Sequence, residues 1–226
     1  MTTLVLAAHP DDEVLGCGGT MARLAQESEA VYVAILGEGI TSRAAQPEHA
    51  DASQVEVLRN CSRRVATHLG ARECFLYGLP DNRFDTVPLL DIVKIIEDLV
   101  AKLKPETVYT QHGGDLNVDH VQLYRATLTA TRPMAGCPVR GLYAYEVASS
   151  TEWAFQQFSP AFRPSVFVNI ETTLERKIEA MQMYESEARV FPHPRAPEAL
   201  KAQAQRWGTA TGLAAAEAFD LVRLVR

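Results

Sequence analysis

Four side chains near the amino terminus, His9, Asp11, Asp12 and Glu13, could bind a metal ion or transfer protons. They directly follow the apolar run 4–8, which predicts a buried strand, and they open a predicted helix. Burying three adjacent acids without a cation costs several kcal/mol, because the carboxylates repel one another and lose their hydration. His9 and Asp12 lie three positions apart across a predicted tight turn, so both could reach one divalent ion. Asp11 would then stay unliganded, next to a water molecule that the ion activates.

The alternative for this segment is a helix cap. Acids in the first turn of a helix interact favourably with its dipole, by about 0.3–1 kcal/mol each. A cap needs fewer than three acids, however, and it gives His9 no function. The segment therefore favours a metal site and leaves the cap as the competing interpretation.

A second polar cluster follows the predicted strand 107–111 and again precedes a predicted helix. Its members are His112, Asp115, Asn117, Asp119 and His120. Parallel strands end at the same edge of a sheet, so the two clusters can meet in space. His120 would then complete a set with His9 and Asp12. Three nitrogen and oxygen ligands with one open position are typical of catalytic zinc, whereas structural zinc sites are usually closed by four ligands rich in cysteine.

Gly16, Gly18 and Gly19 raise the possibility of a dinucleotide site. Their spacing does not match G-x-G-x-x-G, and they come after the acids, inside the predicted helix rather than in the turn before it. We expect these small residues to let the helix pack close to the sheet.

The elements that must position the two clusters alternate along the chain. Strands are predicted at 4–8, 30–36, 74–78, 107–111 and 166–170, and helices at 14–26, 52–69, 89–103, 118–131 and 174–186. This alternation indicates one α/β domain, residues 1–226, with a mainly parallel sheet. Two loop-rich regions, 37–47 and 133–164, are expected to cover a site or form a subunit contact. The segment 191–197 predicts a stiff turn before a final Ala-rich helical stretch.

Composition excludes several classes of function. The formal charge of −6 and the absence of a long basic run argue against nucleic acid as a partner. No apolar run approaches the 18 or more residues of a membrane span, and the first apolar run is too short for the core of a signal peptide. We therefore expect a cytoplasmic protein. The four cysteines form no Cys-x-x-Cys pair, which favours reduced structural thiols.

The motif Ala8-His-Pro-Asp-Asp-Glu13, continued by Val-Leu-Gly-Cys-Gly-Gly-Thr20, resembles the signature of the LmbE-like family, also called PIG-L, of metal-dependent N-deacetylases. Asp119-His120 resembles the family's second metal-binding motif, and Leu79-Pro-Asp-Asn-Arg83 its substrate-side loop. The stretch from Arg206-Trp-Gly208 through Glu217-Ala-Phe219 resembles its C-terminal ending.

The resemblance implies a Rossmann-like, three-layer fold and a hydrolase that uses Zn²⁺ or another divalent metal. The implied reaction removes the N-acetyl group of an amino sugar or of its nucleotide or glycoside conjugate. Position by position, His9, Asp12 and His120 would be the metal ligands. Asp11 would be the general base that takes a proton from the attacking water, which agrees with the spacing argument. Relatives are often oligomeric, so a homo-oligomer is possible.

The second motif departs from the family pattern. Many relatives have His-x-Asp-His, whereas this chain has Asn117-Val-Asp-His120. Asn117 can donate a hydrogen bond to an oxyanion but cannot supply a proton near pH 7. The proton for the leaving amine would come from Asp11 itself or from His112. Asp119 would orient a neighbouring imidazole or the loop.

Four residues are candidates for substrate binding. Arg43 and Arg83 lie in predicted loops beyond strand ends, where a guanidinium could bind a phosphate or carboxylate or simply be solvated. Asp81 and Asn82 could bond to sugar hydroxyls or make a turn. Two other functions remain open. One is an amide hydrolase for another N-acyl substrate, such as an N-formyl compound or a natural product, and the other is a catalytically silent metal- or sugar-binding protein on the same fold.

Overall fold

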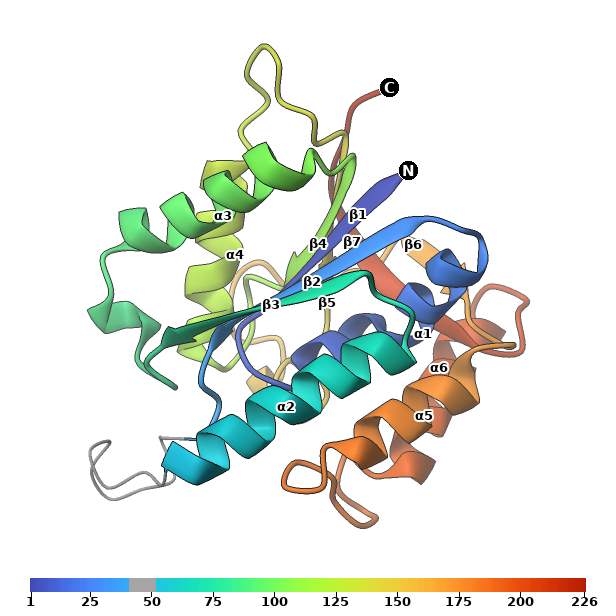
Figure 1. Cartoon of the computed structure of the whole chain (residues 1–226). Helices are drawn as coiled ribbons and strands as arrows, with labels where there is room; N and C mark the ends of the chain where they lie inside the picture. The colour runs from blue at the N-terminus through green and yellow to red at the C-terminus, as the bar shows by residue number, and fades with distance from the viewer. Residues whose placement is uncertain (41–51) are drawn as a thin grey trace.

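A seven-stranded mixed sheet organises the chain (Figure 1). The computed structural model describes residues 1–40 and 52–226. The strands, in the order in which they lie across the sheet, are β3 (Glu73–Leu79), β2 (Ala30–Gly37), β1 (Thr2–Ala7), β4 (Thr107–Gln111), β5 (Gly141–Tyr145), β7 (Ala216–Leu224) and β6 (Val166–Asn169). The pairs from β3 to β5 are parallel, and β7 runs antiparallel to both of its neighbours.

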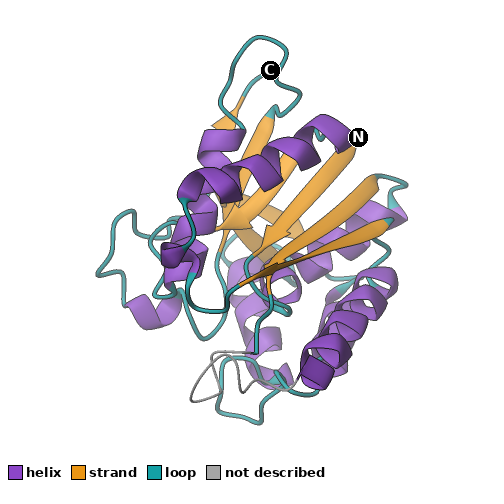
Figure 2. Ribbon diagram, turned by 60° about the vertical axis from the view of Figure 1, so that its left-hand side comes forward, coloured by secondary structure: helices purple, strands orange, loops and turns teal. Residues whose placement is uncertain are grey.

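Helices cover both faces of this sheet (Figure 2). One face carries α1 (Asp12–Gln26), α2 (Ala52–His68), α5 (Leu174–Met183) and α6 (Pro197–Thr209), and the other carries α3 (Leu89–Leu103) and α4 (Val118–Ala130). The short 3-10 turns η3 (Phe84–Thr86) and η4 (Glu152–Ala154) lie in connecting segments of the described part of the chain. The expected α/β three-layer, Rossmann-like domain is confirmed.

The first strand shows why the sheet forms a middle layer. In β1, Leu4 and Leu6 belong to the apolar core under α3 and α4, whereas Val5 and Ala7 belong to the core under α1 and α2. Successive strand residues point to opposite faces, so an unbroken apolar run becomes buried on both sides. The core therefore fixes the direction of β1 and the place where the following loop begins.

The sequence prediction was wrong in two places. The region 133–164, predicted to be loop, contains β5, and the final Ala-rich stretch, predicted to be helical, divides into α6 and the strand β7. The residues of β5 form a run of only five between proline-containing segments, and β7 is rich in alanine and charged residues. Pairing with β4 and β6 determines their conformation, because tertiary contacts override weak local preference.

The glycines of α1 have the packing role expected of them. A Cβ on Gly16 would overlap the ring of Tyr145, and a Cβ on Gly19 would lie 2.8 Å from Ile170. Tyr145 cannot simply turn away, because its hydroxyl donates a hydrogen bond of 2.7 Å to the Leu6 carbonyl. Close packing at these glycines sets the position of the helix that carries Asp12.

No helix in residues 1–40 and 52–226 is long and apolar enough to cross a membrane.

Candidate active site

The loops after β1 and β4 meet at the carboxyl edge of the sheet. His9 Nδ1 lies 3.3 Å from Asp12 Oδ2, and His120 Nε2 lies 3.3 Å from the same oxygen. His9, Asp12 and His120 are buried and offer three ligand atoms within 4.8 Å of one another. The expectation that the two clusters face each other is correct as a matter of geometry.

These three atoms fit a zinc ion. Bonds of about 2.0–2.1 Å to a tetrahedral zinc place neighbouring ligand atoms about 3.3–3.4 Å apart. The two distances to Asp12 Oδ2 match that edge. Two imidazole nitrogens and one carboxylate oxygen are also a donor set that zinc prefers.

The carboxylates of the site favour positive charge on the two histidines. Burial opposes protonation of His9 and His120, but the surrounding carboxylates outweigh it. The pKa of His9 lies well above its ordinary value, and that of His120 is raised to about 9. Burial would raise the pKa of Asp12, yet the two imidazoles hold it below its ordinary value. The protonated imidazoles thus offset the negative charge of the carboxylates, as a bound cation would.

Each of the two histidines contacts another carboxylate through the ring nitrogen that does not face Asp12. His9 Nε2 lies 2.9 Å from Asp119 Oδ2, and Asp119 Oδ1 accepts a hydrogen bond of 2.8 Å from the Phe84 backbone N–H. His120 Nδ1 lies 3.1 Å from Asp115 Oδ1, at ion-pair distance. These contacts leave His9 Nδ1 and His120 Nε2 turned towards Asp12. Carboxylates in this position orient the imidazoles of metal sites and fix their tautomers.

Asp115 and Asp12 are themselves held in place. Asp115 accepts hydrogen bonds from the hydroxyls of Ser150 and Thr151, the latter at 2.5 Å. Asp12 Oδ2 accepts bonds of 2.8 Å from the His9 backbone N–H and from Gln111 Nε2. Hydrogen bonds from neighbouring residues therefore hold both Asp12 and Asp115 in position.

The first cluster does more than cap a helix, although Asp12 and Glu13 do lie in the first turn of α1. Asp11 is the N-cap residue of α1, but its side chain makes no capping hydrogen bond. Asp12 bonds backwards to His9, and Glu13 Oε2 accepts from the Asp11 backbone N–H at 3.1 Å. Asp11 also has a φ of 104°, which strains any residue other than glycine. Strain of this kind is typical of functional positions.

A polar cleft opens beside these groups. Its volume is about 170 Å³. It is lined by His9, Pro10, Asp11, Asp12, Gly39, Asp81, Asn82, Asn117, His120, Ser149, Ser150, Glu187 and Arg195. Nearly all of these residues are polar or charged, so the cleft suits a hydrophilic substrate.

Comparison with known proteins identifies the family. The profile of the PIG-L family, GlcNAc-PI de-N-acetylase, matches residues 4–131, more than half of the chain. The chain belongs to the PIG-L family. The motif after β1 and the Asp119-His120 pair both fall within the matched segment.

Two relatives of this PIG-L chain are named deacetylases. The uncharacterized deacetylase YaiS of Escherichia coli K12 is 26% identical over 189 residues, which cover 81% of this chain and 90% of YaiS. The 1D-myo-inositol 2-acetamido-2-deoxy-alpha-D-glucopyranoside deacetylase of Mycobacteroides abscessus is 31% identical over 210 residues, which cover 80% of this chain and 75% of that protein.

The same fold also occurs in a hydratase. The crystal structure of GalB from Pseudomonas putida KT2440, the 4-carboxy-2-hydroxymuconate hydratase, superposes with a TM-score of 0.76 at 20% identity. The match covers the whole of this chain and 98% of GalB. At that identity the likeness concerns the fold alone, so the reaction must be argued from the site.

Of the other residues that the sequence predicts for the site, some line the cleft and some do not. Asp81 is buried, with Oδ1 3.3 Å from His9 Nε2, and Asn82 and Asn117 line the cleft. Asn117 caps α4 by accepting from the Asp119 backbone N–H, and its Nδ2 donates to Asn82 Oδ1 at 2.9 Å. Arg83 is exposed and is not among the residues that line the cleft.

Arg43 lies outside the described residues. His112 is buried but does not line the cleft. Its ring meets Phe162 edge-on, its Nε2 is 3.6 Å from Asp220, and burial lowers its pKa. The structure therefore does not bring His112 together with Asp11.

Several residues that surround the site could not be found from sequence motifs. Gln111, Ser150 and Thr151 hold the ligands or their supporting acids, and Arg195 contacts Asp11. Gln111 immediately precedes the second cluster, which was a usable signal. Arg195 is separated from Asp11 by 184 residues, and no periodicity connects the two positions.

Proposed function

We propose that this PIG-L protein is a zinc-dependent N-deacetylase that hydrolyses the acetamide of an N-acetylated amino sugar or of its nucleotide or glycoside conjugate. The observation that carries the proposal is the buried set of His9 Nδ1, Asp12 Oδ2 and His120 Nε2, with distances that fit zinc, in a polar cleft beside Asp11. A bound zinc ion would acidify a water molecule and polarise the acetamide carbonyl.

Asp11 is the proposed general base. It lines the cleft, directly precedes a proposed ligand and makes no capping bond that would occupy its carboxylate. Burial raises its pKa well above the ordinary value, although the Arg195 guanidinium opposes that shift. A carboxyl group with a raised pKa can accept a proton from water and return it to the leaving amine.

The same residue is the better candidate for the general acid. His112 lies against Phe162 and Asp220 rather than in the cleft, and Asn117 has no acidic proton to give. Asn117 Nδ2 carries two hydrogens, of which Asn82 accepts one. The second can donate to the oxygen of the carbonyl as negative charge develops on it.

Two findings support an amino sugar as the substrate. The cleft is lined by amide, hydroxyl and carboxylate side chains, which are suitable partners for sugar hydroxyls. The M. abscessus relative is named for an acetamido sugar linked to inositol. Another N-acyl compound and ligand binding without catalysis are the competing functions, and the occurrence of this fold in a hydratase makes direct measurement of acetate necessary.

The test is incubation with N-acetyl sugars, UDP-linked sugars, aryl glycosides and N-formyl analogues, with zinc and with a chelator. Acetate or formate and primary amine are measured together. We expect zinc-dependent, stoichiometric release of acetate and amine from an N-acetyl sugar. Release of formate alone would favour the other acyl substrate, and no turnover with zinc, manganese or cobalt would contradict the proposal.

The role of Asp11 is tested by Asp11→Asn, with the exposed Asp85→Asn as the matched control. Both remove one carboxylate charge, but only the first removes the proposed base. We expect Asp11→Asn to lose at least about 10²-fold in kcat while still binding zinc, because general acid and base catalysis contributes 10²–10⁴-fold. Full turnover in Asp11→Asn would exclude Asp11 as the base.

A further inference from the structure

A clamp centred on Arg195 holds the carboxylate of Asp11. Arg195 Nη1 donates hydrogen bonds of 2.7 Å to Asp11 Oδ2 and 3.1 Å to Glu187 Oε2, and its Nε donates a bond of 2.8 Å to Ser149 Oγ. The side chains of Asp11 and Glu187 are 3% and 4% exposed, and that of Arg195 is 21% exposed. Three residues from separate segments, Asp11, Ser149 and Glu187, thus converge on one guanidinium.

The segment that carries Arg195 is itself well anchored. Its backbone N–H donates to His193 Nδ1 at 3.1 Å, and the adjacent Ala196 is fully buried at the start of α6. Glu187 is tied to the end of α5 through a backbone bond of 2.8 Å to Tyr184. The backbone that carries Arg195, in the stiff turn that the sequence predicts at 191–197, is therefore held in place on both sides of this residue.

Asp11 needs such a partner because acids surround it. Asp12, Glu13 and Glu187 all disfavour its negative charge, and Arg195 is the cation that opposes them. Within residues 1–40 and 52–226, Arg195 is the hydrogen-bond partner of Asp11 Oδ2, and Oδ1 accepts no hydrogen bond. One oxygen is therefore held while the other is left for a ligand of the cleft.

We propose that Arg195, supported by Glu187 and Ser149, is a positioning residue that orients the Asp11 carboxylate for proton transfer in the cleft. The inference rests on the proposed function of Asp11 as the base, and adds a residue from the opposite end of the chain to the working site. Arg195 acts through Asp11, since two of its nitrogens are already committed to Asp11, Glu187 and Ser149.

The experiment compares Arg195→Ala with Arg189→Ala. Arg189 belongs to the same segment but is exposed, and among the described residues it donates only to the carbonyls of Ser186 and Ala188. For each variant, kcat, KM, zinc affinity and the melting temperature are measured with the N-acetyl sugar that the wild type hydrolyses. We expect kcat of Arg195→Ala to fall about 10²-fold, because misplacing a catalytic group by about 1 Å has that effect. We expect its KM and zinc affinity to match those of Arg189→Ala.

Chemical rescue separates orientation from folding. Low-millimolar guanidinium should restore part of the lost kcat in Arg195→Ala and should leave Arg189→Ala unchanged. Arg195→Lys, which keeps the charge but not the forked donors, should be intermediate. An unchanged kcat, a higher KM at constant kcat, or a loss of activity that only follows a lower melting temperature would each overturn the proposal.

Crystal structures of Arg195→Ala and Arg189→Ala provide a readout that does not depend on turnover. The Asp11 carboxylate should rotate away from its position in the first variant and keep it in the second. An unmoved Asp11 in Arg195→Ala would overturn the inference even if the enzyme is a deacetylase. A rotated Asp11 would uphold the orienting role even if the wild type hydrolyses none of the acetamides, in which case only the proposed function fails.

Discussion

The hydrogen bond between Asp119 Oδ2 and His9 Nε2 determines where the proton of the His9 ring lies. With the proton on Nε2, the lone pair of Nδ1 is available towards Asp12, 3.3 Å away. The sequence predicts that Asp119 orients a neighbouring imidazole or the loop, and its contacts with His9 Nε2 and the Phe84 backbone N–H support both roles, which stay a proposal. The partner imidazole, His9, lies 110 positions away in sequence, so only the fold could identify it.

Asp119→Asn should reverse that arrangement. If the new amide oxygen keeps the bond from the Phe84 N–H, its NH₂ group faces His9 Nε2 and favours a proton on Nδ1, where metal should bind. We expect the affinity for zinc to fall about 10–100-fold, as is usual when such supporting carboxylates are removed. Competition with a chromophoric chelator measures it.

Asp85→Asn serves as the control for Asp119→Asn. It makes the same change of charge at an exposed position one residue after Phe84. Equal zinc affinities in the two variants would show that Asp119 does not set the tautomer of His9.

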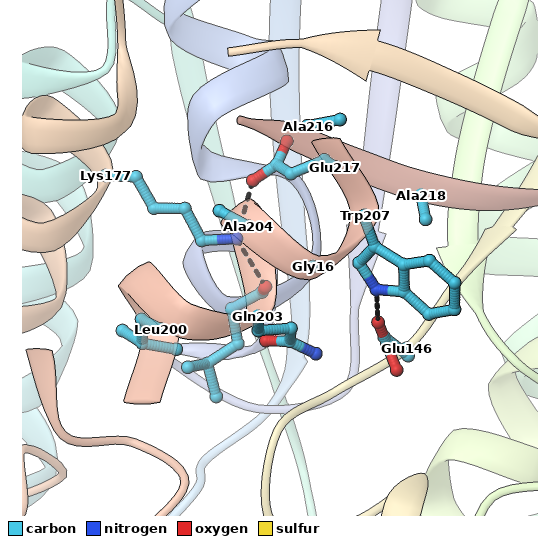
Figure 3. Close-up of a pocket in the computed structure, with 11 residues that line it drawn as sticks. Gly16, Glu146, Lys177, Leu200, Gln203, Ala204, Trp207, Ala216, Glu217 and Ala218 are labelled. Carbon is cyan, nitrogen blue, oxygen red and sulfur yellow. Dashed lines mark hydrogen bonds and ion pairs between the residues drawn. The ribbon is translucent and has the colours of Figure 1, made fainter. Parts of the chain in front are cut away.

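At the scale of elements, a buried ion pair joins α1, α5 and β7 (Figure 3). Lys177 Nζ donates to Glu217 Oε1 at 2.6 Å and to the Leu15 carbonyl at 2.8 Å. Glu217 also accepts the backbone N–H groups of Gly19 and Thr20 in α1. Both charged side chains are nearly inaccessible, so each depends on the other for compensation.

Lys177→Met should destabilise the protein by about 3–5 kcal/mol, because it leaves Glu217 buried without its counter-charge. Lys201→Met is the matched control, since Lys201 makes an exposed pair of 3.7 Å with Glu175. Exposed pairs contribute about 0–1 kcal/mol. Urea unfolding measures both free energies, and equal losses would refute the importance of the buried pair.

Prediction from sequence succeeded for elements with strong periodic or apolar patterns. The helix predicted at 89–103 is α3, Leu89–Leu103, and the strand predicted at 107–111 is β4. The last strand, β7, contains Ala216, Glu217 and Ala218, residues that favour helix in isolation. Its strand conformation comes from pairing with β5 and β6, which no local window contains.

At the scale of the whole molecule, the metal-free protein should lose stability as pH rises. The pKa of His120 in the folded protein is about 9, above the value of about 6.5 expected when unfolded. Its proton therefore contributes stability that is complete below pH 6.5 and is lost as pH rises through 9. The contribution is on the order of 3 kcal/mol. Burial also raises the pKa of Glu13 to about 7. Its ionisation in the folded protein therefore lowers the stability further as pH rises.

Urea unfolding in a chelator at pH 6 and pH 9 tests this prediction. His120→Gln should flatten the pH dependence, whereas His68→Gln, on the α2 surface, should retain it. Saturating zinc should also reduce the loss, because the cation replaces the protons in offsetting the acids. A metal-free protein that gains stability from pH 6 to pH 9 would contradict the charge balance described for the site.

The position of β7 has a consequence for how the chain acquires its site during synthesis. β7 follows β6 in sequence but lies between β5 and β6 in the sheet, and its Glu217 holds the helix that begins with Asp12. Residues 1–40 are synthesised before β7, so the bonds from Glu217 to the Gly19 and Thr20 backbone form later than the pairing of β1 with β2 can. A nascent chain that stops before β7 leaves the edge of β5 unpaired, and an exposed strand edge promotes aggregation. Synthesis of β7 is thus the step that joins β6 to the rest of the sheet and adds the bonds from Glu217 to the helix that carries Asp12.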